Sequence, residues 1–357
     1  MLSVDAIKAR AKQLGFDLCG IAPAADLPEL GRLREWLNLG YGGEMDYLEK
    51  SADTREDIRR FLPTARSVIV TATVYYTHSE EETSDCRGIA PAAVARYAWG
   101  EDYHLVLAER LEALVAWMRE THASPFDAAV FVDKHHVQER VYARHAGLGW
   151  IGKNTCLINP DIGSWILLGG VALSLDLPAD EIVPDHCGEC TLCIDACPTG
   201  AIVDDHALDA TRCISYLTIE LKDAIPEAQR PAVGAHLFGC DICQEVCPYN
   251  LAPLATGDPV WQPRAGRHRP DAAALWQRSD QALHAFVRGS AMTRTTLSRL
   301  RRNLAVVLGN AGDARARDVL DRAGAAVPNA APSADTPLVR GHVAWASSVQ
   351  GSPDGRD

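Results

Sequence analysis

Apolar residues recur with two different spacings in the first half of the chain. Helical spacing marks residues 3–15, 103–120 and 136–146, whereas "SVIVTATVYY", "AAVFVD" and "WILLGGVALSL" are β-rich runs. The alternation predicts an α/β domain over residues 1–180. The core-facing stripe predicted for the helix at 103–120 consists of Leu105, Leu107, Leu111, Leu114 and Trp117.

The second half of the chain changes character twice. Cys, Pro and Gly dominate residues 184–250, with one helical insert near 214–223. A linker rich in Pro, Gly and Arg leads from there into short helical segments joined by Gly, Asn and Pro turns. We therefore predict a cysteine-rich domain over 181–255 and an α-helical, HEAT-like repeat unit over 270–350.

Length and composition restrict the class of protein. The 357 residues, 47% hydrophobic and 23% charged, suffice for two or three domains with their own cores. The N-terminal segment lacks the features of a secretory signal, and no apolar run approaches the about 18 residues that a membrane-spanning helix requires. We therefore expect a cytoplasmic protein with no membrane partner.

The net charge of −12 argues against indiscriminate binding to nucleic acid. A local exception lies between Arg288 and Arg302, where five arginines occur without an acidic residue. Such a cluster fits phosphate binding and fits a solvated helix face equally well.

Eight cysteines between residues 187 and 247 carry the strongest chemical signal. "CGECTLCIDACP" has the spacing C-x2-C-x2-C-x3-C-P, which is typical of ferredoxins that bind [4Fe–4S] clusters, and "CDICQEVCP" repeats it with one cysteine fewer. Because the fourth cysteine of such a run binds the other cluster, crossing the sets predicts two clusters in an α+β ferredoxin-like domain. One set is Cys187, Cys190, Cys193 and Cys247, and the other is Cys197, Cys213, Cys240 and Cys243. A pair of zinc sites is the alternative, since zinc also accepts four cysteines.

Electrons held by two clusters require an acceptor. No G-x-G-x-x-G segment joins a strand to a helix, so a Rossmann-type nucleotide site is not indicated. Polar residues instead follow the predicted strands: Asp133, then Glu139 and Arg140, and the loop "GLGWIGKNT". Each has an ordinary structural explanation, as a helix cap, a surface charge or a turn. Together they predict a redox cofactor or substrate site.

Several segments in order resemble one family. "ARYAWGEDYH", "AGLGWIGKNT", "CGECTLCIDACPTGAI", "RCISYLTIEL", "FGCDICQEVCPYN" and "RRNLAVVLGNAG" are similar to the epoxyqueuosine reductases, cobalamin-dependent iron–sulfur enzymes of tRNA modification. The resemblance covers about residues 5 to 346. It implies reduction of the epoxide of epoxyqueuosine to the alkene of queuosine at the wobble position of tRNAs with a GUN anticodon (Asp, Asn, His and Tyr). It also implies cobalamin, an external low-potential electron donor and a monomer.

The resemblance also assigns roles to residues. Asp133 is implied to be the proton donor, with a pKa raised by its cavity. The implied cobalamin contacts are Arg55, Tyr97, Asp133, Arg140, Lys153, Asn154, Thr155, Ser215 and Asp241. The candidates for tRNA contact are Lys222, Arg294, Arg299, Arg301 and Arg302.

Two features depart from the family pattern. Lys134, His135 and His136 follow Asp133, where the family usually has a small residue, then Ala or Gly, then Pro. A lysine close to the acid would lower its pKa. No D-x-H-x-x-G segment is present, which implies cobalamin held without a histidine of that motif. A reductive dehalogenase-like corrinoid enzyme and a ferredoxin-type electron-transfer protein are the alternatives.

Overall fold

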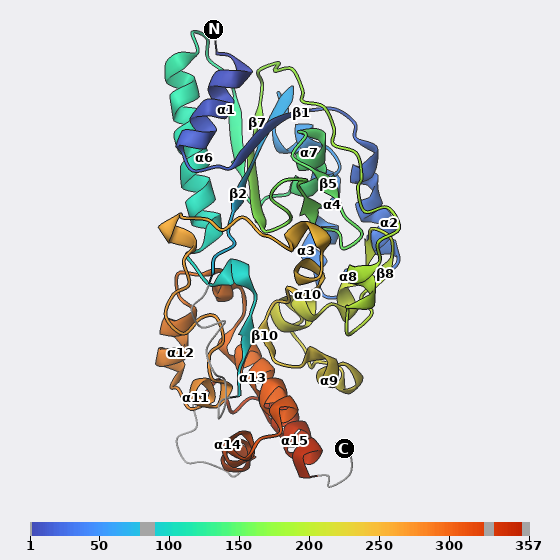
Figure 1. The fold of residues 1–357 in the computed structure, drawn as a ribbon, viewed down its shortest axis with the longest axis vertical. Coiled ribbons are helices and arrows are strands. Elements are labelled where there is room, and N and C mark those ends of the chain that lie inside the picture. The colour runs from blue at the N-terminus through green and yellow to red at the C-terminus, as the bar shows by residue number, and fades with distance from the viewer. Residues whose placement is uncertain (1, 79–89, 325–331, 352–357) are drawn as a thin grey trace.

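The structure is a computed structural model that describes residues 2–78, 90–324 and 332–351 (Figure 1). The N-terminal part forms one end of an elongated molecule and the C-terminal helices form the other. Within the described residues, no helix is both long and apolar enough to cross a membrane.

A four-stranded sheet organises the N-terminal part, and every neighbouring pair in it is antiparallel. The mixed α/β character predicted for this region is confirmed, with antiparallel pairing as the feature that the pattern did not specify. In spatial order the strands are β1 (Leu18–Pro23), β2 (Ser67–Val74), β7 (Ile166–Leu173) and β4 (Ala128–Phe131).

Helices cover both faces of this sheet, so its central strand β2 is buried along its whole length. On one face Ile69 packs with α1 (Val4–Gln13) and α6 (Tyr103–Thr121). On the other face Val68 and Val70 pack with α7 (Glu139–His145). Successive side chains of a strand point to opposite faces, so both faces of β2 are buried, and the hydroxyls of its Thr71 and Thr73 donate to the carbonyls of Gly169 and Gly15.

The predicted helix at 103–120 is confirmed, but one member of its stripe is wrong. Leu107, Leu111 and Leu114 are fully buried, and Trp117 packs partly against the same core. Leu105 is 66% exposed. Residues two apart on a helix do not share a face, so the stripe through Leu107 cannot include it.

Short helices and strands make up the rest of the N-terminal part and the cysteine-rich segment. The helix expected near 214–223 is a single π-helical turn, Tyr216–Glu220, whose first four residues are buried. Before the sheet closes, the chain forms α2 (Arg32–Asn38), α3 (Asp46–Lys50), α4 (Ala52–Arg55), α5 (Ile58–Phe61), β3 (Ala93–Val94), β5 (Trp150–Ile151) and β6 (Leu157–Ile158). After β7 follow α8 (Leu192–Asp195), β8 (Ile202–Asp204), β9 (Ala207–Leu208), α9 (Arg230–Val233), β10 (His236–Phe238) and α10 (Ile242–Glu245).

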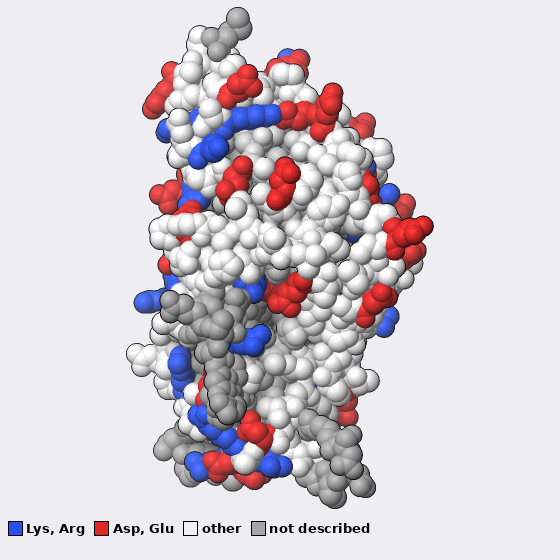
Figure 2. Space-filling model, in the orientation of Figure 1, with Lys and Arg blue, Asp and Glu red and all other residues white. Residues whose placement is uncertain are grey.

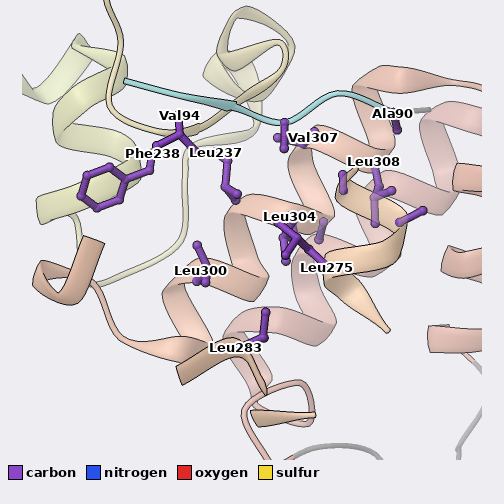
Figure 3. Close-up of a cluster of buried hydrophobic side chains, with 14 of the residues drawn as sticks. Ala90, Val94, Leu237, Phe238, Leu275, Leu283, Leu300, Leu304, Val307 and Leu308 are labelled. Atoms are coloured by element: carbon purple, nitrogen blue, oxygen red, sulfur yellow. The ribbon is translucent and has the colours of Figure 1, made fainter. Parts of the chain in front are cut away.

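The helical character predicted for the C-terminal region is present. Its elements are α11 (Ala272–Trp276), α12 (Asp280–Val287), α13 (Leu297–Ala311), α14 (Ala314–Gly324) and α15 (Pro337–Gly351). They do not form a separate core, because Leu300 and Leu304 of α13 belong to the same buried cluster as Leu237, Phe238 and Val94 (Figure 3). The helical unit is therefore continuous with strands β3 and β10 from earlier in the chain.

Two arginines of the predicted basic cluster are structural. Arg302 is fully buried and donates hydrogen bonds to the carbonyls of Leu217 (2.6 Å), Leu221 (2.8 Å) and Asp223 (2.7 Å). Arg301 is 1% exposed and donates to the carbonyls of Trp276 and Arg278 and to Ser333. A phosphate cannot reach either guanidinium, so the prediction that these two contact tRNA is wrong.

Charge on the surface is mixed rather than segregated. Figure 2 shows acidic and basic side chains side by side on the face in view, with a broad uncharged area across its middle. On this face the charged side chains therefore lie in small groups of mixed sign. Any attraction of a polyanion to it would be local.

Candidate active site and cysteine centres

Asp133 lies in the loop after β4, at the N-terminal end of α6. Its φ angle of 42° is in the left-handed region, which Asp tolerates better than most residues. Oδ2 accepts a hydrogen bond from the hydroxyl of Tyr103 (2.8 Å) and lies 2.9 Å from Nε2 of His104. The side chain is 58% exposed. One carboxylate oxygen is thus held by two donors of α6 while the group remains accessible.

The electrostatics of Asp133 differ from the expectation. Burial raises the pKa of this carboxyl. Hydrogen bonds from His104 and Tyr103 lower it by more, and the positive charges of His104 and Arg294 lower it further. The pKa of Asp133 therefore lies below its usual value, and the expectation of a raised pKa is wrong. Hydrogen bonds to the ionised form always act in this direction.

His104 is itself held from its other side. Its Nδ1 lies 2.6 Å from Oδ1 of Asp102, and both side chains are only 12% exposed. Burial lowers the pKa of His104, but its hydrogen bonds to Asp102 and Asp133 outweigh that effect and raise the pKa above its usual value. Neither Tyr103 nor His104 was predicted as a site residue, although "EDYH" gave a visible signal: a titratable pair at a helix N-terminus.

Glu139 supports the loop that carries Asp133. Its Oε1 accepts the backbone N–H of Asp133 at 2.5 Å. Burial, followed by the nearby charge of Asp133, raises the pKa of Glu139 to about 8. Arg55 is buried close by, where its guanidinium donates to Ser51 (2.9 Å) and to the carbonyl of Val137 (3.2 Å). Predicted site residues from three elements thus meet around one loop.

Arg294 brings the C-terminal part of the chain to the same place. It makes a two-pronged ion pair with Glu220 (2.8 and 3.0 Å) and lies over the ring of Tyr47. Its charge contributes to the lowered pKa of Asp133, so it lies within electrostatic range of the acid. Glu220 ends the π-helical turn, and such turns are frequent at functional sites.

The first predicted cysteine set lines one cavity. This cavity has a volume of about 260 Å³, and Trp150 donates from its indole nitrogen to Cys187 at 3.4 Å. Lys153 and Asn154, expected as cobalamin contacts, border the same cavity, and Lys153 forms an ion pair with Asp205 (3.1 Å). The lining cysteines are Cys187, Cys190, Cys193 and Cys247.

The second predicted set is also gathered together. Burial raises the pKa of Cys240 to about 12, and the neighbouring Cys213 and Cys197 contribute to the rise. The pKa of Cys243 is raised too. Its hydrogen bond with Cys156 is the largest cause, followed by burial, and Cys240 and Cys213 contribute. Among the described residues no three Cys, His, Asp or Glu side chains converge closely enough to hold a single metal ion.

The remaining predicted cofactor residues lie around the space between the acid and the second cysteine set. Tyr97 is within electrostatic range of both Asp133 and Asp241. Asp241 is buried, accepts the backbone N–H of Arg96 at 2.7 Å, and has a pKa raised to about 7 by burial. Ser215 hydrogen-bonds to Cys213. Arg140 donates to the carbonyl of Thr155 at 2.5 Å and so fixes the glycine-rich loop.

Comparisons with known proteins agree with this arrangement. Residues 55–134 match the family model described as epoxyqueuosine reductase QueG, DUF1730, and residues 186–250 match a 4Fe-4S double cluster binding domain. The chain is 40% identical to the epoxyqueuosine reductase of Xanthomonas campestris pv. campestris over 97% of its length and 95% of that protein. It is 37% identical to the Escherichia coli K12 enzyme, over 96% and 88%. The chain belongs to the epoxyqueuosine reductase family.

Solved structures of this family share the fold. An epoxyqueuosine reductase with a tRNA-Tyr epoxyqueuosine-modified stem loop matches with a TM-score of 0.87 and 30% identity, over 98% of this chain and 90% of that one. The Bacillus subtilis epoxyqueuosine reductase, with its catalytic aspartate loop swung out of the active site, matches with the same values. The likeness thus covers the acid loop, both cysteine sets and the C-terminal helices together.

Proposed function

We propose that this protein reduces the epoxide of epoxyqueuosine in tRNA to the alkene of queuosine. The substrates are tRNAs with a GUN anticodon, those for Asp, Asn, His and Tyr. The observation that carries the proposal is that Tyr97 lies within electrostatic range of both Asp133 and Asp241, the neighbour of Cys240 in the second cysteine set. Proton donor and electron path then meet at one place. Family membership over nearly the whole chain supports the same reaction.

Two [4Fe–4S] clusters fit the eight cysteines. We assign the first to the set that lines the cavity beside Trp150 and the second to the set around Cys213. Clusters of this type supply electrons one at a time, at low potential. Asn154 donates from its side chain to the carbonyl of Cys243 and also borders the first cavity, so it links the two sets. The electrons come from an external low-potential donor.

Cobalamin would be held by the residues expected between Asp133 and the second cysteine set. Their hydroxyl, carboxyl and guanidinium groups are of the kinds that hydrogen-bond to the amide side chains of a corrinoid: Arg55, Tyr97, Arg140, Thr155, Ser215 and Asp241. Cobalamin bound there would supply the reducing centre that removes the epoxide oxygen. Lys153 and Asn154 border the first cysteine set and would reach the corrinoid only at its edge.

Asp133 donates the proton that the leaving oxygen needs. Its Oδ2 is held by hydrogen bonds from Tyr103 and His104, which position the group for the substrate. The modified base leaves its stack to reach this position, as bases do in other enzymes that act on them. Lys222, Arg294 and Arg299 are the tRNA contacts that remain after the two buried arginines are removed from the set. We expect the protein to act as a monomer in the cytoplasm.

The test uses tRNA from a strain that lacks this activity. Protein reconstituted without oxygen, with iron, sulfide and cobalamin, should convert epoxyqueuosine to queuosine, measured by the mass of the nucleoside. Asp133→Asn should keep the optical spectra of clusters and corrinoid but lose about 100-fold or more in turnover. Asp161→Asn, at an exposed aspartate in the turn before β7, is the matched control and should behave as wild type.

The same experiment separates the alternatives. A ferredoxin-type electron carrier would bind two clusters, no corrinoid, and leave the nucleoside mass unchanged. A reductive dehalogenase-like enzyme would bind the corrinoid and release halide from an aryl halide while leaving the tRNA intact. Full turnover by Asp133→Asn would refute the acid assignment alone.

A further inference from the structure

We propose that Asp133 does not work as a lone acid, and that His104, held by Asp102, is the positioning residue that supplies its proton. The three side chains form one hydrogen-bonded chain, Asp102–His104–Asp133. The inference rests on the proposed function, because it names the source of the proton for the epoxide oxygen.

The geometry of the chain is complete at every link. Nδ1 of His104 lies 2.6 Å from Asp102 and Nε2 lies 2.9 Å from Asp133, so both ring nitrogens face a carboxylate oxygen. An imidazole flanked in this way donates from both nitrogens, which is the bonding pattern of its protonated form. Tyr103 stacks on the same ring, with centroids 4.0 Å apart, and prevents the ring from turning away.

Asp102 is fixed independently of His104's ring. It is the N-cap of α6, where Oδ1 also accepts the backbone N–H of His104 at 3.1 Å. A residue fixed by a helix start cannot rotate without losing the cap. Two of its three members, Asp102 and His104, therefore belong to the beginning of a nineteen-residue helix.

Other charged and titratable groups surround the pair from each neighbouring element. From the loop after β4, Lys134 acts on Asp102, and from α7 the half-buried Glu139 accepts the backbone N–H of Asp133. From the C-terminal side Arg294 acts on Asp133, and from the segment before α6 Tyr97 faces it. The groups in hydrogen-bond contact with His104 are its two carboxylates, and they raise its pKa while that of Asp133 is lowered. A proton shared by the two groups is therefore held by the histidine in preference to the carboxylate.

The proton balance of the reaction explains the use of such a chain. Removal of an epoxide oxygen as water consumes two electrons, from the clusters, and two protons. A proton on Nε2 of His104 moves to Oδ2 of Asp133, and the carboxyl group then rotates and donates it to the oxygen as the C–O bond breaks. His104 takes the next proton from solvent, and the second transfer follows the same route to complete the water molecule.

The first experiment needs neither cofactor nor substrate. Nuclear magnetic resonance of protein with isotope-labelled histidine, with His104 assigned by its loss in His104→Gln, should give a His104 pKa above the usual value of about 6.5. Asp102→Asn and Asp133→Asn should each lower it by about one unit or more, since each removes an adjacent negative charge. Asn also caps helices well, so Asp102→Asn keeps α6. A His104 pKa at or below 6.5, or one that neither substitution changes, would overturn the proposal.

The second experiment measures turnover against pH with epoxyqueuosine-containing tRNA. His104→Gln can still donate a hydrogen bond to Asp133 but cannot carry a proton. Its kcat should fall about 100-fold at neutral pH with KM unchanged, and the alkaline limb of the profile should move to lower pH. Added imidazole should restore part of the activity of His104→Ala. His136→Gln, an exposed histidine of the Asp133 loop, is the control and should match wild type.

The outcomes separate the two proposals. A wild-type profile for His104→Gln would refute the role of His104 while leaving the reductase intact. If the wild-type enzyme failed to convert the tRNA, the proposed function would fall, and the coupled titration measured on the cofactor-free protein would still decide whether the chain exists.

Discussion

Arg302→Met tests whether the C-terminal helices are anchored to the cysteine-rich segment through buried carbonyls. Arg302 supplies hydrogen bonds to Leu217, Leu221 and Asp223, at the two ends of the π-helical turn. A hydrogen bond from a charged donor contributes about 1.5–3 kcal/mol, and a buried acceptor left without a donor costs about 1–3 kcal/mol. Methionine fills a similar length but offers no donor.

The opposing term is the cost of the buried charge. Burial lowers the pKa of Arg302 to about 9, so the charged guanidinium in this position destabilises the folded protein. Three unsatisfied carbonyls would destabilise by about 3–9 kcal/mol, and relief of the buried charge offsets part of this. We expect Arg302→Met to lower the free energy of unfolding by about 3–5 kcal/mol.

The assay is urea denaturation of the cofactor-free protein, followed by circular dichroism, together with hydrogen exchange of residues 214–223. Exchange in that segment should accelerate, because its carbonyls lose their anchor. Arg294→Met is the matched control: its ion pair with Glu220 is exposed, and such pairs contribute about 0–1 kcal/mol. A loss below about 1 kcal/mol for Arg302→Met, with unchanged exchange over 214–223, would refute the reasoning.

Three further predictions concern cofactors, tRNA and pH. Cys247→Ser should halve the iron content, from about eight to about four atoms per chain, and leave the second cluster spectrum intact; zinc in place of iron in wild type would contradict the cluster assignment. Lys222→Gln should weaken tRNA binding and reduce the salt slope of the affinity by about one, whereas an unchanged slope would remove Lys222 from the interface. Because the pKa of Glu139 is raised to about 8, the folded protein binds a proton that the unfolded chain releases above about 4.5, so stability falls as pH rises between these values. Glu139→Gln should abolish that loss in denaturation curves measured from pH 5 to 8, and parallel curves for the two proteins would contradict it.

The short-range patterns in the sequence predicted most of the chemistry. Cysteine spacing is a property of a few consecutive residues, so it indicated both sets before any fold was known, and the structure gathers each set together. Asp133 was identified from its family motif. His104 and Tyr103 were missed because their role depends on where the loop after β4 meets the start of α6, which is a tertiary contact.

The errors have the same origin. The arginines of 288–302 look equivalent in the sequence, yet Arg294 is exposed and Arg302 is fully buried. Charge alone does not reveal which face of α13 meets the π-helical turn. For an acid in a cavity, burial alone predicts a raised pKa. For Asp133, hydrogen bonds from two donors of α6 lower the pKa instead.

The cavity closed by Cys247 has a consequence for biosynthesis. Three of its cysteines lie between residues 187 and 193, but the fourth is made only after some fifty further residues, when the ribosome has already completed the ligands around Cys213. The first cube cannot acquire its full thiolate shell before Cys247 is made, and the second cannot before Cys243 is made. Metal loading therefore follows the closing of the polypeptide around both sites, and a chain terminated before residue 240 would hold three cysteines of the first set and two of the second, with both sites incomplete.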